Sequence, residues 1–250
     1  MFNVTDCLNF GDGESSTSEN NICFSSSKEL LCEYEWLIFL DSRGLERNGS
    51  IEKTWLFKLC ASFDERNISY LAVSRPKNIT VFATLVNFMN LNDIYFTRLL
   101  TNLGFVDCTP KKKVFIKDIE KQIKEFFSHN LSVCTFPQYL NSDGGLINLY
   151  SLQYNDDYLN SVAKYLSFSF AERYFITTPL TEPSLAFKRQ RPDCFYKQLG
   201  ITNNLIRAIS TLASTKVIDV AALSLTTFDG VHFTDSDHEQ LGNNIIKWVL

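Results

Sequence analysis

The chain has 250 residues, of which 45% are hydrophobic and 21% are charged. These values are ordinary for a globular protein, and the length is that of one domain. The net charge of −4 argues against general binding of nucleic acid or of an anionic membrane surface, because both depend on clustered Lys and Arg. No apolar stretch approaches the length needed to cross a bilayer, so we expect no membrane span.

Cysteine and histidine are the residues that would reveal a metal site or a disulfide framework. The chain has 7 Cys and 3 His. No two Cys have CxxC spacing, the odd total does not suggest a closed disulfide framework, and no His lies near a Cys pair. We therefore expect no metal and no cofactor. Residues 1–27 lack the basic segment and apolar run of a secretory signal, which predicts a cytoplasmic location.

The composition predicts a flexible N-terminal extension over residues 1–30 and a single domain over residues 31–250. Residues 11–28 are rich in Ser, Asn, Gly and acidic side chains, a composition typical of a loose segment. The first strong strand signal is the apolar run of residues 36–40, which ends at Asp41 and Ser42. An unbroken apolar strand is typical of a sheet that is covered on both faces.

Helix and strand patterns alternate after this run. They predict helices over residues 51–66, 81–89, 117–127, 158–170, 193–213 and 234–248, with strands over 68–73, within 94–106, and over 173–178 and 216–221. This alternation predicts an α/β fold, a three-layer α/β/α sandwich around a mainly parallel, flavodoxin-like sheet. In such folds the active site lies at the carboxyl ends of the strands.

Polar residues follow the first and the last predicted strands. Asp41 and Ser42 come after the first, and Asp229 and His232 come after the last. A serine hydroxyl is a weak nucleophile, so it needs a base to take its proton and a third group to hold the base. Asp229, three residues before His232, can reach one ring nitrogen and leave the other facing Ser42. The pattern predicts a Ser-His-Asp triad of these three residues.

Two segments strengthen this interpretation. Residues 38–44, Ile-Phe-Leu-Asp-Ser-Arg-Gly, resemble the first conserved block of the SGNH (GDSL-type) hydrolases, with Leu40 in place of the usual Gly. Residues 227–242 resemble the last block of that family, in which D-x-x-H precedes the final helix. Between them, residues 103–110 resemble a variant found in SGNH-like proteins of bacterial surface-polysaccharide gene clusters. The resemblance implies an α/β serine hydrolase, and the G-x-S-x-G elbow of other esterases is absent.

The sequence departs from the family in the oxyanion hole. The family uses a Gly N–H in its second block and an Asn side chain in its third. Here the corresponding loop, residues 74–80, has no Gly, and Val106 stands at the Asn position. Loss of one oxyanion donor typically costs about 10²–10³ in rate. The nearest replacement candidates for oxyanion or substrate binding are Ser74, Arg75 and Asn78. Asp107 is a further candidate for substrate binding, with helix capping as its alternative.

Other reactive residues have simpler explanations. His238 follows Asp235 by three residues, but it lies within the last predicted helix, where packing is expected rather than base catalysis. His129 has no acidic pattern around it and is expected to be structural or exposed. Cys108 has no base beside it in the sequence and is expected to be a small buried residue.

Three functions remain open from the sequence. The first is a serine esterase that acts through an acyl-enzyme, with a small-molecule or carbohydrate ester as substrate and a carbohydrate-linked acetyl ester favoured by the resemblance. The second is an O-acyltransferase that passes the acyl group to a polysaccharide sugar. The third is a non-catalytic SGNH-like binding domain with a degenerate oxyanion hole. A phosphate-binding domain ranks below these, because no Gly-rich loop follows a predicted strand.

Overall fold

The computed structural model describes residues 22–27, 31–44, 51–74, 79–104, 108–140, 145–180, 193–227 and 230–250. Its centre is a six-stranded sheet with strand order β1-β3-β2-β4-β9-β10. These strands are β1 (Ile22–Ser25), β2 (Glu33–Leu40), β3 (Tyr70–Ser74), β4 (Tyr95–Thr101), β9 (Glu172–Ile176) and β10 (Lys216–Ile218). The strands from β3 to β10 pair in parallel, and β1 pairs antiparallel with β3 at the edge.

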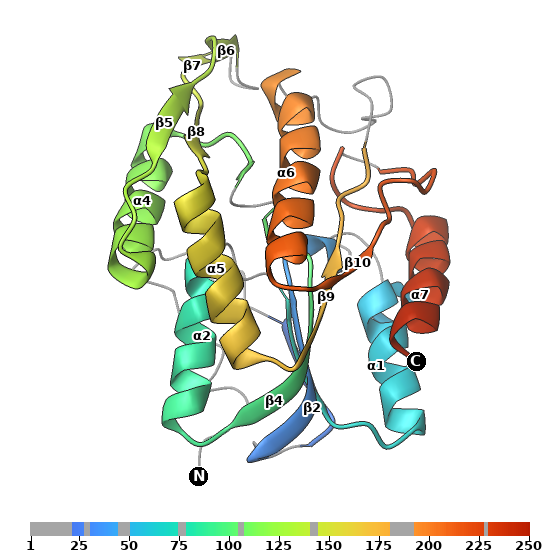
Figure 1. Ribbon diagram of the computed structural model, residues 1–250. Helices are drawn as coiled ribbons and strands as arrows, with labels where there is room; N and C mark the ends of the chain where they lie inside the picture. The colour runs from blue at the N-terminus through green and yellow to red at the C-terminus, as the bar shows by residue number, and fades with distance from the viewer. Residues whose placement is uncertain are drawn as a thin grey trace.

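Helices cover both faces of this sheet (Figure 1). The described α-helices are α1 (Trp55–Glu65), α2 (Ile79–Leu91), α4 (Lys113–Phe127), α5 (Asp156–Ser169), α6 (Asp193–Leu212) and α7 (Asp235–Val249). Helices α1 and α7 pack together on one face, and α2, α5 and α6 contribute to the core on the other. The predicted three-layer α/β/α sandwich with a mainly parallel sheet is therefore confirmed.

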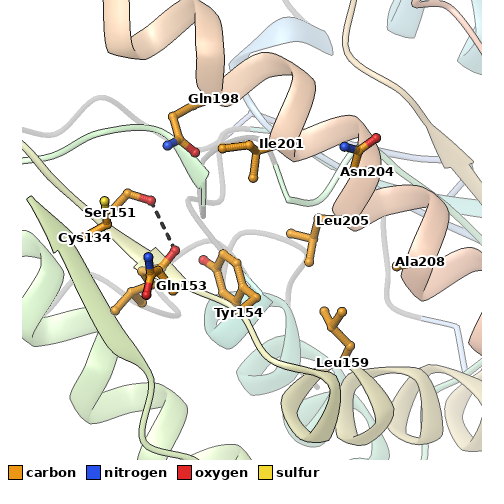
Figure 2. Close-up of a pocket in the computed structure, with 11 residues that line it drawn as sticks. Cys134, Ser151, Gln153, Tyr154, Leu159, Gln198, Ile201, Asn204, Leu205 and Ala208 are labelled. Carbon is orange, nitrogen blue, oxygen red and sulfur yellow. Dashed lines mark hydrogen bonds between the residues drawn. The ribbon is translucent and has the colours of Figure 1, made fainter. Parts of the chain in front are cut away.

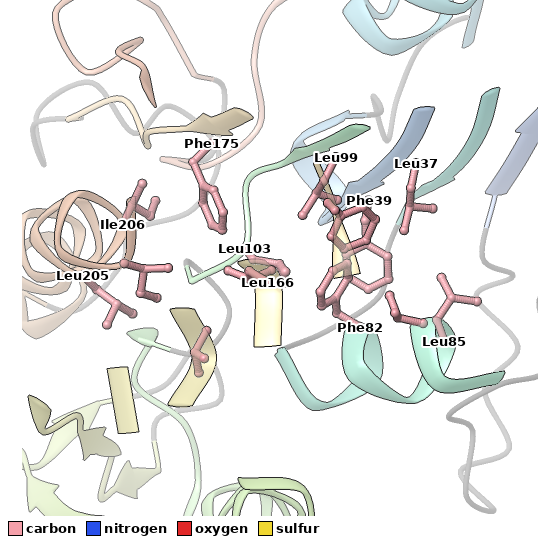
Figure 3. Close-up of a cluster of buried hydrophobic side chains, with 14 of the residues drawn as sticks. Leu37, Phe39, Phe82, Leu85, Leu99, Leu103, Leu166, Phe175, Leu205 and Ile206 are labelled. Atoms are coloured by element: carbon pink, nitrogen blue, oxygen red, sulfur yellow. The ribbon is translucent and has the colours of Figure 1, made fainter. Parts of the chain in front are cut away.

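The side chains of β2 explain why the sheet is covered on both faces. Trp36 and Ile38 point into one apolar cluster with α1 and α7. Leu37 and Phe39 point into the other, where Phe39 packs edge-to-face on Phe82 of α2. Figure 3 shows this second cluster between the sheet and the helices. Because successive side chains of a strand alternate between faces, an unbroken apolar strand supplies both cores.

Residues 22–25 are a correction to the sequence analysis, which placed them in the flexible N-terminal extension. They form β1, whose partner is β3 in the register Ile22 to Ser74 and Ser25 to Leu71. Phe24 packs edge-to-face on Phe57 of α1. This apolar contact and the backbone ladder fix a segment whose composition is otherwise polar. The proposed boundary between residues 30 and 31 stays a prediction.

The excursion between α4 and α5 was not predicted. It contains two small antiparallel pairs, β5 with β8 and β6 with β7. Their bounds are β5 (Ser132–Thr135), β6 (Tyr139–Leu140), β7 (Leu146–Ile147) and β8 (Tyr150–Gln153). In Figure 1 this excursion stands beside the first turns of α6, beyond the carboxyl ends of the parallel strands. Among the described helices, none is both long and apolar enough to span a membrane.

Candidate active site

Ser42 and His232 meet at the carboxyl edge of the sheet. The Ser42 Oγ lies 3.0 Å from the His232 Nε2. Ser42 begins a short 3-10 turn directly after β2, and His232 lies in the loop between β10 and α7. Ser42 is partly exposed, whereas His232 is 4% exposed. At this distance the serine hydroxyl and the imidazole are within hydrogen-bond reach, with the hydroxyl on the accessible side.

We call residues 41–44 the nucleophile turn, because the sequence analysis predicts Ser42 as a nucleophile. Its two flanking side chains, Asp41 and Arg43, form a buried ion pair with 2.7 Å between Asp41 Oδ2 and Arg43 Nη2. The Arg43 Nε also donates to the Asp41 carboxylate at 3.0 Å, and the Arg43 backbone N–H donates to Asp41 Oδ1 at 2.8 Å. Ser42 is thus held between two residues that fix each other.

The buried ion pair also ties the nucleophile turn to the neighbouring strands. Asn102, just after β4, accepts from the Asp41 N–H at 2.9 Å and donates to Asp41 Oδ1 at 3.0 Å. Arg43 Nη1 donates to the Thr178 hydroxyl at 2.6 Å. Thr178 follows β9. Its backbone N–H donates to Asn203 Oδ1 of α6, and Asn203 Nδ2 donates to the Thr178 carbonyl, both at 2.7 Å. The carboxyl ends of β2, β4 and β9 are therefore joined by one polar network.

Gly44 closes the nucleophile turn because the space around it is narrow. A Cβ at this position would lie 2.9 Å from the Leu40 Cδ1 and 3.4 Å from the Ser74 Oγ. The Ser74 hydroxyl in turn donates to the Asp41 carbonyl at 3.0 Å. On the next helix, the Trp55 Nε1 donates to the Arg43 carbonyl at 2.9 Å. The backbone on both sides of Ser42 is thus supported by β3 and α1.

The loop that carries His232 is anchored on both sides of the imidazole. Val231 packs with Phe195 and Leu199 of α6, and Phe233 is buried in the cluster under α7. Phe233 also pairs with Thr227 as an isolated bridge. Gly230 has φ 82°, a left-handed conformation that favours glycine. The apolar neighbours and this turn place the ring toward Ser42.

His238, the alternative base, has a different environment. It is fully buried in α7, where its Nδ1 accepts from the Trp55 backbone N–H at 3.4 Å. Phe233 contacts the ring edge-to-face. Burial lowers the pKa of His238 to about 4, because the charged form would lose its hydration. His238 is therefore a neutral packing residue, as expected from its helical position.

The remaining sequence candidates have varied positions. Ser74 ends β3 and is fully buried, and its hydroxyl supports the Asp41 carbonyl. Its predicted part in oxyanion binding stays a prediction. Asp229, Arg75, Asn78 and Asp107 lie outside the described residues. His129 is half-buried, with its Nε2 2.8 Å from the Ser161 Oγ, and Cys108 is buried, as expected.

The sequence analysis missed Asn102, Thr178 and the pairing of Asp41 with Arg43. A usable signal existed for Asn102 and Thr178, since each is a polar residue at the end of a predicted apolar strand. The resemblance drew attention to residues 104–107 instead, two positions after Asn102. Among the described side chains, no group of three His, Cys, Asp or Glu residues could hold a metal ion.

Comparisons with known proteins bear on the fold. No protein-family model matches the chain, and no curated protein sequence matches it. A solved structure of a carbohydrate acetylesterase family member from Sinorhizobium meliloti is 14% identical with a TM-score of 0.50, covering 86% of this chain and 97% of that chain. An acetyl xylan esterase from Geobacillus stearothermophilus is 12% identical with a TM-score of 0.47, covering 87% and 96%. The chain therefore shares the fold of the Sinorhizobium structure, in agreement with the α/β fold that the sequence resemblance implied.

Proposed function

We propose that the protein is a serine esterase in which Ser42 is the nucleophile, His232 the general base and Asp229 the residue that holds His232. The observation that carries this proposal is the 3.0 Å contact between Ser42 Oγ and His232 Nε2, made by residues 190 positions apart in the chain. A nucleophile and its base within hydrogen-bond reach, at the carboxyl edge of a parallel sheet, are the signature of acyl transfer.

The reaction follows from these positions. His232 Nε2 takes the Ser42 proton while Oγ attacks the acyl carbon, and the resulting imidazolium returns that proton to the leaving alcohol. Water then attacks the acyl-enzyme, gives its proton to His232, and releases the acid and the free Ser42 hydroxyl. Asp229 would hold the ring through Nδ1–H, so that Nε2 is the accepting nitrogen. The Ser42 backbone N–H would be one donor to the oxyanion.

The buried ion pair has a positioning part in this proposal. Its charges cancel, and both Asp41 and Arg43 are buried, at 6% and 3% exposed. The ion pair therefore contributes by positioning: its network fixes the conformation of the nucleophile turn, so that Ser42 contacts His232 before substrate binds. Preorganisation of this kind removes an entropic cost from the chemical step.

We further propose that the substrate is an ester carried by a carbohydrate. The similar Sinorhizobium structure is described as a member of a carbohydrate acetylesterase family, and the sequence resemblance favours the same substrate class. Water is the acceptor in this proposal. An O-acyltransferase would use the same acyl-enzyme with a sugar hydroxyl as acceptor, and the two are distinguished by adding an unesterified sugar and analysing the products.

Hydrolysis of p-nitrophenyl acetate tests the catalytic assignment. We expect Ser42→Ala and His232→Ala each to lower kcat by at least about 10³-fold, because either change removes the nucleophile–base pair. Ser236→Ala and His129→Ala are matched controls, since both residues lie outside the site, and they should keep activity. Retention of wild-type turnover by Ser42→Ala would overturn the proposal and favour a binding domain.

A further inference from the structure

A groove separate from the nucleophile turn runs between β8 and α6. Its volume is about 600 Å³, enough for a ligand the size of a short oligosaccharide. Figure 2 shows Gln153 and Tyr154 on one side and Gln198, Ile201 and Asn204 on the helix opposite. We call it the amide groove after the carboxamides of Gln153, Gln198 and Asn204.

The chemistry of the amide groove favours a neutral polyhydroxylated ligand. The described residues that line it include no Asp, Glu, Lys or Arg. A carboxamide has both donors and an acceptor, so it matches the vicinal hydroxyls of a sugar. Between the amides lie Leu159, Leu205 and the ring of Tyr154, apolar surfaces that fit the C–H faces of a pyranose. A purely apolar ligand such as an acyl chain would offer no partner to the Gln198 carboxamide.

Gln198 supplies the most specific observation. The residue is 6% exposed, and its carboxamide makes no hydrogen bond within the described part of the chain. Figure 2 shows this amide extending from α6 toward the β8 side of the groove. The amide atoms are not among the fully buried side-chain atoms that lack a partner in the described chain, so they face the space of the groove, where a bound ligand can form hydrogen bonds with them.

A neighbouring amide on α6 shows the contrast. Asn203 is 2% exposed, and both ends of its amide bond the Thr178 backbone at 2.7 Å. Helix α6 therefore uses one satisfied amide to support the polar network of the nucleophile turn, while Gln198 and Asn204 face the groove. Helix α6 thus contributes one residue to the polar network beside Ser42 and other residues to the amide groove.

We propose that the amide groove binds neutral sugar residues of the carbohydrate whose ester is cleaved at Ser42. This assignment rests on the proposed function for its link to the reaction, but binding itself does not require turnover. The two can therefore be tested separately, in the full chain carrying Ser42→Ala.

The test is a titration of the Ser42→Ala protein with xylohexaose and cellohexaose, followed by isothermal calorimetry. Hexagalacturonate is the charged comparator, and decanoate is the apolar one. We expect saturable binding of at least one neutral hexasaccharide, weakened about tenfold by Gln198→Leu, which keeps the side-chain bulk but loses the amide. Asn204→Ala, at an exposed position, should weaken it as well. Asn243→Ala on α7 is the matched amide control and should bind normally.

Several outcomes would overturn the assignment. These are no binding of either neutral hexasaccharide, binding that both groove variants leave unchanged, and tighter binding of decanoate or hexagalacturonate that Gln198→Leu removes. Failure of turnover in the wild type would count against the proposed function alone, since the titration uses a protein without the nucleophile.

Discussion

In the nucleophile turn the side chains of Asp41 and Arg43 are both hydrogen-bonded to protein groups. In the amide groove the Gln198 carboxamide makes no hydrogen bond within the described chain. Arg43 alone contacts Asp41, Thr178 and the Asn102 carbonyl. Gln198, at similar burial, faces open space. The first arrangement fixes a geometry before substrate binds, and the second leaves hydrogen bonds for a ligand to make. Under the two proposals, the nucleophile turn after β2 would carry the chemistry and the groove beside α6 would bind the carbohydrate.

Of the variants that test this difference, we expect Arg43→Met to change the free energy of unfolding most. It leaves the Asp41 carboxylate buried without its cation, which we expect to lower the free energy of unfolding by about 3–5 kcal/mol. Urea denaturation measures the change. Where the variant folds, kcat for p-nitrophenyl acetate should fall while KM stays close to wild type, because the nucleophile turn loosens but the substrate contacts remain.

The double variant Asp41→Asn with Arg43→Met is the matched control. It removes both charges, so much of the lost stability should return, although the tie to Thr178 stays broken. A loss of less than about 1 kcal/mol in Arg43→Met would mean that the buried ion pair does not organise this region.

A second, smaller effect concerns pH and His238. Its folded pKa of about 4 lies below the unfolded value of 6.5, so between these values the unfolded chain binds more protons than the folded one. Stability is therefore lost as pH falls through this window, by about 2 kcal/mol between about pH 7 and pH 5. Urea midpoints at the two pH values measure it.

His238→Gln provides the control for this prediction. Gln keeps an acceptor for the Trp55 N–H but does not titrate, so the variant should lose about 2 kcal/mol less over the same interval. Equal pH dependence in the two proteins would show that other groups dominate acid destabilisation and that His238 is less shielded than its burial indicates.

The smallest effect should come from Gly230→Ala in the loop that carries His232. With φ 82° at this position, an L-residue costs about 1–2 kcal/mol, and relief of that strain would move His232 away from Ser42. We expect a lower kcat, measured with p-nitrophenyl acetate, along with the loss in stability. Gly200→Ala in α6 is the control: a Cβ there meets nothing within 4 Å, so it should be neutral or stabilising by up to about 1 kcal/mol. Unchanged kcat in Gly230→Ala would show that the loop tolerates the change.

Sequence patterns predicted the parts of the fold that apolar periodicity controls. The run of residues 36–40 predicted β2, and helical spacing predicted α5 and α6, with ends within a few residues of those observed. The pairs β5–β8 and β6–β7 were not predicted, because strands of two to four residues that are mostly half-exposed or exposed show little hydrophobic periodicity. Strand β1 was not predicted either, because its stability comes from pairing with β3, which the composition of the segment does not reveal.

The candidate site divides in the same way. Ser42 and His232 could be selected from motif blocks, and the structure brings them together. The contact of Asn102 with Asp41 spans 61 positions, and no local spacing specifies it. The amide groove is even harder to predict from the sequence, because Gln153 and Gln198 line one space only after the excursion has folded against α6. Local patterns predict elements, whereas these contacts depend on how the elements pack.

The most direct test of the central claim is covalent labelling of the full chain with a fluorophosphonate, located by peptide mass spectrometry. We predict stoichiometric labelling of Ser42 in the wild type, much slower labelling in His232→Ala, and none at that position in Ser42→Ala, because only a serine activated by its base reacts. Wild-type labelling at another serine, or labelling of Ser42 at the same rate in His232→Ala, would contradict the account.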